Sequence, residues 1–561
     1  MTTQFRDTQF GHLVRFLSGN KLFRYPDEID PSLWKRSLQR DTTSTSTRSG
    51  EQSNSSEKSK DPNDSTNAPA KDFDTQGVDL QDLSVNNVVE NGKDIYLVDW
   101  YGPDDPENPQ NWPSSWKLLV SFQMCILNFS VYIASSIYVP GILSIMEDFG
   151  ASEIVATLGL SLFTVGYGFG PMLWSPMSEM PKVGRNGIYF WTLLVFVLFQ
   201  LPTGFAVNMP MFLVFRALTG FFGSPSLATG GATIADIYDA ARVAYGICIW
   251  ASFGVCGPVF GPILGGFTAQ AKGWRWTIWV FTWLCTFVLV MLFFFLPETS
   301  AANILYKRAK RLRKATRDDR LRSQSEIDAA HHTMRDHLIV LGRAFTLTFS
   351  EPIVFFMDLY TALLYGVLFI WFESFPLVFG EIYGFNSGQQ GLVFLGIFVG
   401  GVITVPLFLV WVKYGIIPRF TKPTFKPEMV LPPTFFGSAS LPICLFWYGW
   451  SARESIHWIM PIIGSSFFTV GVVTLFNPVF NYLGIAYPPY AASIFAGNAL
   501  FRASFGAIFP LFARQLFRKL GIGPGNSLLG GIAVCFMPVP YIFYKYGEKI
   551  RHMSKNARHD V

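Results

Sequence analysis

The stretch GVCGPVFGPILGGF, from Gly254 to Phe267, places five glycines and two prolines within one long apolar run. In the interior of a soluble helix, a glycine costs about 1 kcal/mol and a proline about 3 kcal/mol relative to alanine. Inside a membrane, neighbouring helices can satisfy the backbone groups that proline leaves unpaired. The stretch therefore predicts a membrane-spanning helix that packs closely against other helices.

The composition of the whole chain supports this interpretation. Of its 561 residues, 50% are hydrophobic and 15% are charged, whereas soluble domains carry about 25% charged residues. Apolar runs of about 20 residues, the length that crosses a bilayer, recur from Trp116 onward. We expect about twelve spans, at 116–138, 153–175, 187–206, 211–235, 243–268, 274–296, 353–379, 388–412, 431–449, 457–482, 490–513 and 527–545. The expected fold class is an all-α polytopic membrane protein.

The spans fall into two sets of six, and this division predicts five parts. They are a largely disordered cytosolic tail (1–98), a six-helix bundle (99–298), a basic cytosolic loop (299–352), a second six-helix bundle (353–546) and a cytosolic C-terminal tail (547–561). Lysine and arginine concentrate in cytosolic loops, and most basic loops here place both termini in the cytosol. Arg514, Arg518 and Lys519 disagree, because this scheme leaves them outside.

The glycines of the opening stretch are spaced so that they share one face of a helix. Gly254, Gly257, Gly261 and Gly265 follow each other at intervals of three and four residues. Small residues let membrane helices approach closely, and the two prolines would bend the helix. We expect a helix that rocks against its neighbour, with ordinary tight packing as the alternative interpretation.

Charged residues inside the expected spans require an explanation, because an ionised group at the bilayer centre costs several kcal/mol. The candidates are Arg216, Asp358, Glu373 and Arg502, with Glu179 and Asp236 near cytosolic ends. No histidine lies in the interior of a span, so proton coupling would depend on buried carboxylates. Asp358 and Glu373 share one span but lie about 22 Å apart, so they cannot form one site. Structural roles, as partners of carbonyl groups or as helix-end acids, are the alternatives.

Several motifs resemble one transporter family. The string GPVFGPILGG resembles the antiporter signature in the fifth span of drug/proton antiporters of the major facilitator superfamily, and the matching residues are Gly257, Gly261, Pro262, Gly265 and Gly266. SPMSEMPKVGR, RALTG and PENPQNW resemble further motifs in the expected order, as does PET at Pro297 to Thr299. The chain is similar to the fungal twelve-span branch, and within it to fluconazole/benomyl-type multidrug exporters.

This resemblance implies a fold and roles for particular residues. The fold would be two six-helix bundles with a substrate site near the midplane. Arg216 would influence the protonation of a nearby acid, and Asp236 would join Glu179 and Arg185 in an inner-gate charge cluster. Side chains expected in the substrate cavity, with a lipid-facing position as the alternative for the aromatic ones, are Tyr360, Phe369, Trp371, Phe372 and Asn498.

The implied function is proton-coupled export of diverse lipophilic drugs, such as azole antifungals, by alternating access. The expected partners are lipophilic or cationic small molecules, protons and the lipid bilayer, without nucleic acid, cofactor or metal, and with the protein as a monomer. The expected location is the plasma membrane, with the vacuolar membrane as an alternative. Export of polyamines or of an endogenous secondary metabolite stays open. The sequence lacks HExxH, GxSxG and GxxxxGK[ST] motifs, so an enzyme or an ATP-driven pump is not expected.

Overall fold

The apolar runs form long helices in the computed structural model, which describes residues 5–30, 87–90, 93–239, 242–330, 342, 345–420, 425–487, 490–554 and 556–557. Among these residues, eleven helices are long and apolar enough to cross a membrane. The expected span 431–449 corresponds to α21 (Pro433–Ser451), which is not among the eleven but packs against α22 and α24. The prediction of a polytopic helical protein is confirmed.

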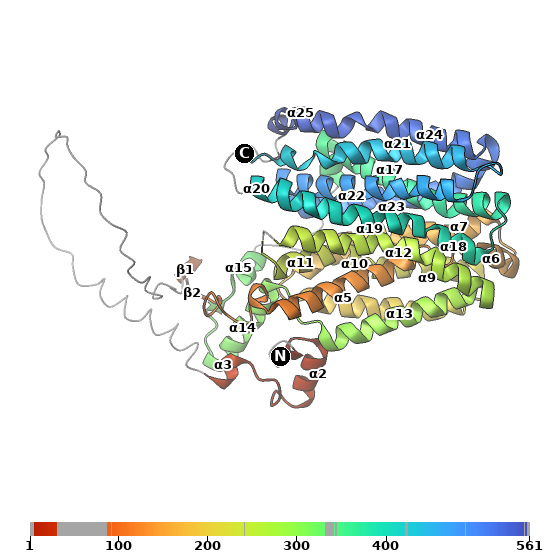
Figure 1. Ribbon diagram of the computed structural model, residues 1–561. Helices are drawn as coiled ribbons and strands as arrows, with labels where there is room; N and C mark the ends of the chain where they lie inside the picture. The colour runs from red at the N-terminus through yellow and green to blue at the C-terminus, as the bar shows by residue number, and fades with distance from the viewer. Residues whose placement is uncertain are drawn as a thin grey trace, which may run out of the picture.

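The helices form two groups, which lie one above the other in Figure 1. The first group contains α5 (Ser114–Ile133), α6 (Ile142–Phe149), α7 (Glu153–Glu179), α8 (Arg185–Gly204), α9 (Met209–Gly223), α10 (Pro225–Ala228), α11 (Gly230–Ile237), α12 (Val243–Lys272) and α13 (Trp274–Phe295). Short 3-10 turns, η1 (Pro109–Asn111) and η2 (Val139–Gly141), flank α5. We call this group the N-bundle.

The second group, the C-bundle, follows the central segment. It contains α17 (Pro352–Phe375), α18 (Ser387–Val393), α19 (Leu395–Trp411), α20 (Ile417–Phe420), α21, α22 (Ile459–Ala486), α23 (Ala491–Leu520), α24 (Ile522–Phe536) and α25 (Pro538–Met553). Two π-helical segments, η3 (Pro376–Ile382) and η4 (Val412–Ile416), extend α17 and α19, and the 3-10 turn η5 (Pro427–Val430) precedes α21. The bundles meet where α7 contacts α23 and where α12 contacts α18 and α19.

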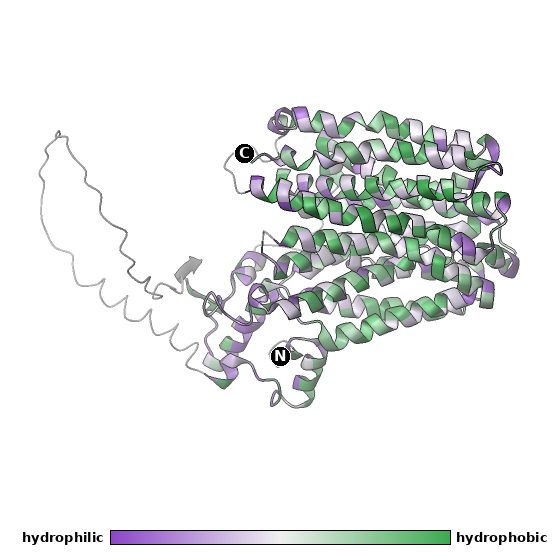
Figure 2. Ribbon diagram, in the orientation of Figure 1, coloured by the Kyte–Doolittle hydropathy of each residue, from purple (hydrophilic) through white to green (hydrophobic). Residues whose placement is uncertain are grey.

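Both ends of the chain lie at the same end of the helical body, on the left of Figure 1. We call this the inner end and the opposite one the outer end. In Figure 2 the helices are mostly hydrophobic along their length, and hydrophilic residues gather at the two ends and in the segments beyond the inner end. A hydrophobic middle with polar ends is the pattern that a bilayer requires.

Helix α12 shows how the glycine face works. A β-carbon at Gly257, Gly261 or Gly265 would lie 2.9 Å or less from atoms of the segment from Tyr132 to Ile137, so only glycine allows this approach. Pro262 has no N–H to donate to the carbonyl of Pro258, and the Ser136 hydroxyl donates to that oxygen instead (3.0 Å). The expected close packing and the satisfaction of a carbonyl freed by proline are both confirmed.

The inner end carries structure that the sequence did not predict. A three-stranded sheet joins β1 (Asn87–Glu90), β2 (Lys93–Leu97) and β3 (Leu321–Arg322), with β1 antiparallel and β3 parallel to β2. Three further helices lie nearby: α2 (Gln9–Leu17), α14 (Ala301–Thr316) and α15 (Gln324–Ala330); a short turn, α3 (Pro26–Ile29), follows α2. The tract Asp41–Asp72, expected to be disordered, lies outside the described residues.

Buried ion pairs tie these segments together at the inner end. Arg308 donates to Asp105 and Glu107 at 2.8 Å each, and Arg6 donates to the other oxygen of Glu107 at 2.9 Å. Burial acts to raise the pKa of Asp105, but the hydrogen bonds and charge of Arg308 outweigh it, so the pKa lies below its ordinary value. These ion pairs join the N-terminal segment at Arg6, the segment before α5 that carries Asp105 and Glu107, and helix α14, which carries Arg308. We call these three segments the docked unit.

Candidate functional site

Two carboxylates share one arginine at the outer end, where the bundles meet. Arg514 on α23 donates from Nε to Glu373 on α17 (2.7 Å) and pairs through Nη1 with Glu153 at the start of α7. The Thr157 hydroxyl of α7 lies 3.5 Å from the second oxygen of Glu373. Glu373 is 1% exposed. This cluster links the N-bundle to the C-bundle with two acids and one base, so its ionised form carries one net negative charge.

Sequence reasoning found Glu373 but missed its partner. Positive-inside counting assigned Arg514 to an external loop, yet α23 continues to Leu520 and carries Arg514 within the helix. The span expected at 490–513 was therefore too short. The sequence did contain one signal for this partner. Arg514 lies at the edge of an apolar run, and its expected external position disagrees with the positive-inside rule.

Nearer the inner end, α17 and α23 hold a second buried chain of polar groups. The Asn498 amide donates to Asp358 Oδ1 (2.8 Å), and Arg502 Nε donates to the Asn498 carbonyl oxygen (2.8 Å). Asp358 Oδ2 is buried without a hydrogen-bond partner in the described part of the chain. Arg502 therefore reaches Asp358 through Asn498, which the sequence placed in the substrate cavity. The separation of Asp358 from Glu373 into two sites is confirmed.

Arg216 of α9 is fully buried but forms a different set of contacts. Its guanidinium donates to the carbonyls of Ala134 (2.8 Å) and Gly159 (3.1 Å) and lies between the rings of Tyr138 and Phe163. None of its hydrogen bonds within the described ranges goes to a carboxylate. An influence of Arg216 on an acid stays a prediction.

At the inner end of the N-bundle, Arg185 and Asp236 form an ion pair between α8 and α11. Arg185 Nε lies 2.5 Å from Asp236, and a second guanidinium nitrogen lies 3.2 Å away. Glu298 accepts the backbone N–H groups of Arg185 (3.0 Å) and Asn186 (3.3 Å), where α8 begins. Glu179 is exposed and within electrostatic reach of Arg185. Arg185 and Asp236 are thus paired and Glu298 joins them, whereas Glu179 forms no ion pair with Arg185 among the described residues.

The outer half of the molecule holds the hydrogen bonds that cross between the bundles. Besides the Arg514 cluster, the Ser161 hydroxyl donates to the carbonyl of Ala507 (2.6 Å), and the backbone N–H of Gly388 donates to Gln270 (3.2 Å). A β-carbon at Gly266 would meet the Ser387 carbonyl at 2.3 Å. The antiporter-signature residue Gly266 therefore faces the other bundle, unlike the glycines that face α5, and the outer end is closed.

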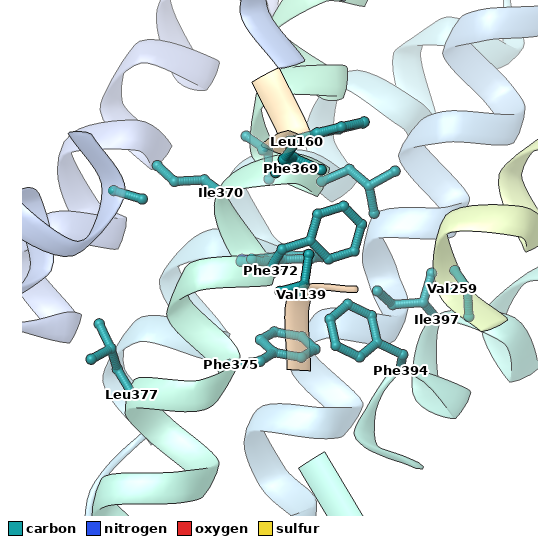
Figure 3. Close-up of a cluster of buried hydrophobic side chains, with 14 of the residues drawn as sticks. Val139, Leu160, Val259, Phe369, Ile370, Phe372, Phe375, Leu377, Phe394 and Ile397 are labelled. Atoms are coloured by element: carbon teal, nitrogen blue, oxygen red, sulfur yellow. The ribbon is translucent and has the colours of Figure 1, made fainter. Parts of the chain in front are cut away.

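The aromatic residues expected in a substrate cavity lie instead in a packed cluster. Figure 3 shows Phe369 and Phe372 among Leu160, Phe375 and Phe394. All four expected aromatic residues are 0–1% exposed; Trp371 packs against Phe468 and Tyr448, and Tyr360 against Phe536. In this conformation Tyr360 and Trp371 are core residues of the C-bundle, because their ring partners all belong to that bundle. Phe369 and Phe372 are buried as well and also lie close to Leu160 of the N-bundle.

A separate cavity of about 560 Å³ lies between the bundles. It is bounded by α5, α12, α19 and α22, with lining residues that include Phe129, Cys256, Val259, Gly401 and Phe476. None of the five residues expected to line the substrate cavity is among those that line this one. Drug-sized ligands occupy pockets of about 300–1,000 Å³, so this cavity has a suitable size.

Two helical bundles that meet around a cavity and buried ionisable groups define a polytopic membrane protein with the architecture of a secondary transporter. Over residues 124–539, the chain matches the Major Facilitator Superfamily. The chain belongs to this family.

Relatives and solved structures agree with this assignment. The chain is 43% identical to "Transporter mfs1" of Schizosaccharomyces pombe, over 85% of this chain and 91% of that protein. It is 40% identical to "Fluconazole resistance protein 1" of Saccharomyces cerevisiae (88% and 89% covered) and 35% identical to the "Cycloheximide resistance protein" of Candida maltosa (99% and 100% covered). The xylose transporter XylE from E. coli, in a partially occluded inward-open conformation, has the same fold, with a TM-score of 0.56 at 15% identity over 77% of this chain and 98% of that one.

Proposed function

We propose that this protein exports structurally diverse lipophilic drugs, including azole antifungals, in exchange for protons. The resistance to fluconazole and cycloheximide that the names of two relatives record supports drug export. Two buried acid–base groupings also support it: Glu373 with Arg514, and Asp358 with Asn498 and Arg502. The plasma membrane is the proposed location, and the protein would act there as a monomer.

One observation carries the proton coupling: Glu153 of the N-bundle and Glu373 of the C-bundle share Arg514. When both acids are ionised, Arg514 divides its charge between them. A proton on Glu373 would leave Glu153 as the only anion, so the charge of Arg514 would hold the two bundles together at the outer end. Loss of that proton would weaken the link and favour opening to the outside.

The effect of protonating Glu373 has the direction that exchange of drug for protons requires. A proton bound from the outside would favour closure of the outer end, and the protein would then open inward to take up drug. Release of the proton inside would favour the return to the outward-open state with drug bound. Asp358, nearer the inner end of the same helix, offers a second proton site through its unpaired carboxyl oxygen.

Reconstituted transport tests the proposal. Purified protein in sealed liposomes should accumulate radiolabelled fluconazole when a pH gradient is imposed, and nigericin, which collapses the gradient, should abolish accumulation. Glu373→Gln should lose the response to the gradient but retain exchange of fluconazole across the membrane. Glu381→Gln removes an exposed carboxylate at the end of the same span and should behave as wild type. Equal accumulation by wild type with and without the gradient would contradict proton coupling.

A further inference from the structure

The cavity between the bundles is built from matched faces of four helices. On α22 its lining residues are Thr469, Val472, Val473, Phe476 and Asn477, which follow the spacing of a single helix face. On α12 the lining positions include Ser252, Cys256 and Val259. The glycines that pack on α5 occupy a different face of α12. Helix α12 therefore packs tightly within the N-bundle on one face and lines the cavity shared with the C-bundle on another.

The lining contains no group that would recognise a charge. None of the described residues that line the cavity is acidic or basic. The hydroxyl groups of Ser252 and Thr469 donate to backbone carbonyls at 2.7 Å each, and the Asn477 amide donates to the Val473 carbonyl at 3.1 Å. These hydrogen-bond donors are already engaged. A cation placed here would lose its hydration without gaining an opposite charge, and the lining phenylalanine rings and the few acceptor oxygens would offset only part of that penalty of several kcal/mol.

The cavity also opens on the side of the helical body, between α12 and α19, on a surface that runs along the helices. Two of its lining side chains, Ile249 and Val402, are 43% and 57% exposed. Both belong to spans, and their neighbours on the α19 surface, Val399 and Ile403, are exposed apolar residues as well. In a bilayer this surface would contact lipid chains. A molecule dissolved in the membrane could therefore enter from the side.

One lining residue connects the cavity to the buried polar chain. The Phe476 ring lies 4.8 Å from the guanidinium carbon of Arg502, and the ring of Phe480, which stacks on Phe476, lies 5.6 Å from it. Arg502 in turn bonds Asn498, which bonds Asp358. A ligand against Phe476 would thus contact the ring that partly shields the charge of Arg502. Cation–π contacts of this kind contribute about 0.5–2 kcal/mol.

We propose that this cavity binds neutral lipophilic molecules taken up from the bilayer, and that Phe476 transmits their binding to the Asp358–Asn498–Arg502 chain. The inference rests on the proposed function and narrows its substrate class. It predicts that this site prefers neutral molecules to polyamines and permanent organic cations, because the lining offers a cation no counter-charge. Neutral azoles have the required chemistry.

Binding to protein in nanodiscs tests the substrate class without any gradient, so failure here is distinguishable from failure of proton coupling. The probes are triphenylphosphine oxide, which is neutral, and tetraphenylphosphonium, a cation of similar shape. We expect saturable binding of the neutral probe and none of the cation. Gly401→Leu should weaken neutral binding by about tenfold or more, equivalent to about 1.4 kcal/mol, because a β-carbon at Gly401 meets only Thr469 at 3.3 Å and the longer side chain would fill the cavity.

A matched control adds bulk to the same helix outside the cavity. Val410→Phe enlarges an exposed side chain on α19 that does not line the cavity and should bind both probes as wild type does. Neutral binding that is unaffected by Gly401→Leu, or equally strong binding of the cation at this site, would overturn the proposal. Native mass spectrometry that finds a phospholipid lost on Gly401→Leu, with neither probe bound, would also overturn it in favour of a resident lipid.

Phe476→Leu tests the transmission. Leucine keeps the lining apolar but removes the ring from Arg502, so neutral binding should stay within about threefold of wild type. Accumulation of fluconazole driven by a pH gradient should fall by about tenfold or more. The matched control is Phe467→Leu, the same substitution on α22 at a ring that packs against Trp447 and does not line the cavity, and it should leave accumulation unchanged. A Phe476→Leu protein that binds the neutral probe and still responds fully to the gradient would remove Phe476 from the coupling.

Discussion

The two bundles bury their charged groups in different ways. In the N-bundle, Arg216 donates to the carbonyls of Ala134 and Gly159 and forms no hydrogen bond to a carboxylate within the described residues. In the C-bundle, α17 carries Asp358 and Glu373, each in contact with a side chain of α23. Arginine keeps its proton at physiological pH, whereas a carboxylate can gain and lose one. We therefore interpret the N-bundle interior around Arg216 and α12 as a fixed surface, and the two carboxylates of α17 as the groups proposed to titrate.

The largest effect should come from a change at the tightest contact of the N-bundle. A β-carbon at Gly261 would lie 2.0 Å from the Ser136 hydroxyl oxygen, which also bonds the Pro258 carbonyl. Gly261→Leu should therefore push α12 away from its neighbour and abolish transport in reconstituted liposomes. Leu264→Phe, at a 37% exposed position of the same helix, serves as control. If Gly261→Leu transported normally, the N-bundle surface would be less fixed than the comparison requires.

A smaller effect should follow from a change in the C-bundle that keeps its shape. Asp358→Asn retains the hydrogen-bond acceptor for Asn498 but cannot exchange a proton. We expect gradient-driven fluconazole accumulation to fall about tenfold, which corresponds to about 1.4 kcal/mol, and its dependence on pH to flatten. Transport by Asp358→Asn that keeps the wild-type pH profile would assign the proton to Glu373 alone.

A change at Arg216 tests directly whether the buried charge of the N-bundle takes part in proton coupling. Arg216→Met would leave the buried carbonyls of Ala134 and Gly159 without these donors, which costs about 1–3 kcal/mol for an unsatisfied buried group. We expect lower thermal stability in detergent and weaker transport whose pH dependence is unaltered. Should the pH dependence flatten, as we expect for Asp358→Asn, the N-bundle would take part in proton coupling, as the family resemblance implies.

The smallest effect concerns the docked unit at the inner end, outside the membrane spans. The pKa of Asp105 is lowered in the folded protein, so its contribution to stability is present above its ordinary pKa of about 3.9 and is lost as the pH falls through the lower, folded value. Pepsin should therefore cleave α14 increasingly between pH 4 and pH 2. Asp105→Asn should expose α14 already at pH 4 and flatten this rise, and an unchanged digestion profile would contradict the role of the pair.

Much of the fold could be read from the residues, because the bilayer imposes a strict length and polarity on each span. The glycine spacing of α12 predicted its contact face, and the charges at Asp236, Asp358 and Glu373 were located on the correct helices, whereas Arg185, expected in a loop, is the first residue of α8. The small sheet and the docked unit at the inner end were not predicted, since β2 pairs with β3 more than two hundred residues away. Such pairings leave no local pattern.

Only the tertiary structure decided which groups meet. Arg514 of α23 pairs with Glu153 of α7 and with Glu373 of α17. Asn498 lies between Asp358 and Arg502 and bonds to both. The aromatic residues next to Glu373 became core, while the cavity formed on other faces. Local sequence determines which residues share a helix face, because helical periodicity is a property of the backbone. The choice of partner for that face depends on how two bundles close around each other, which is a property of the whole chain.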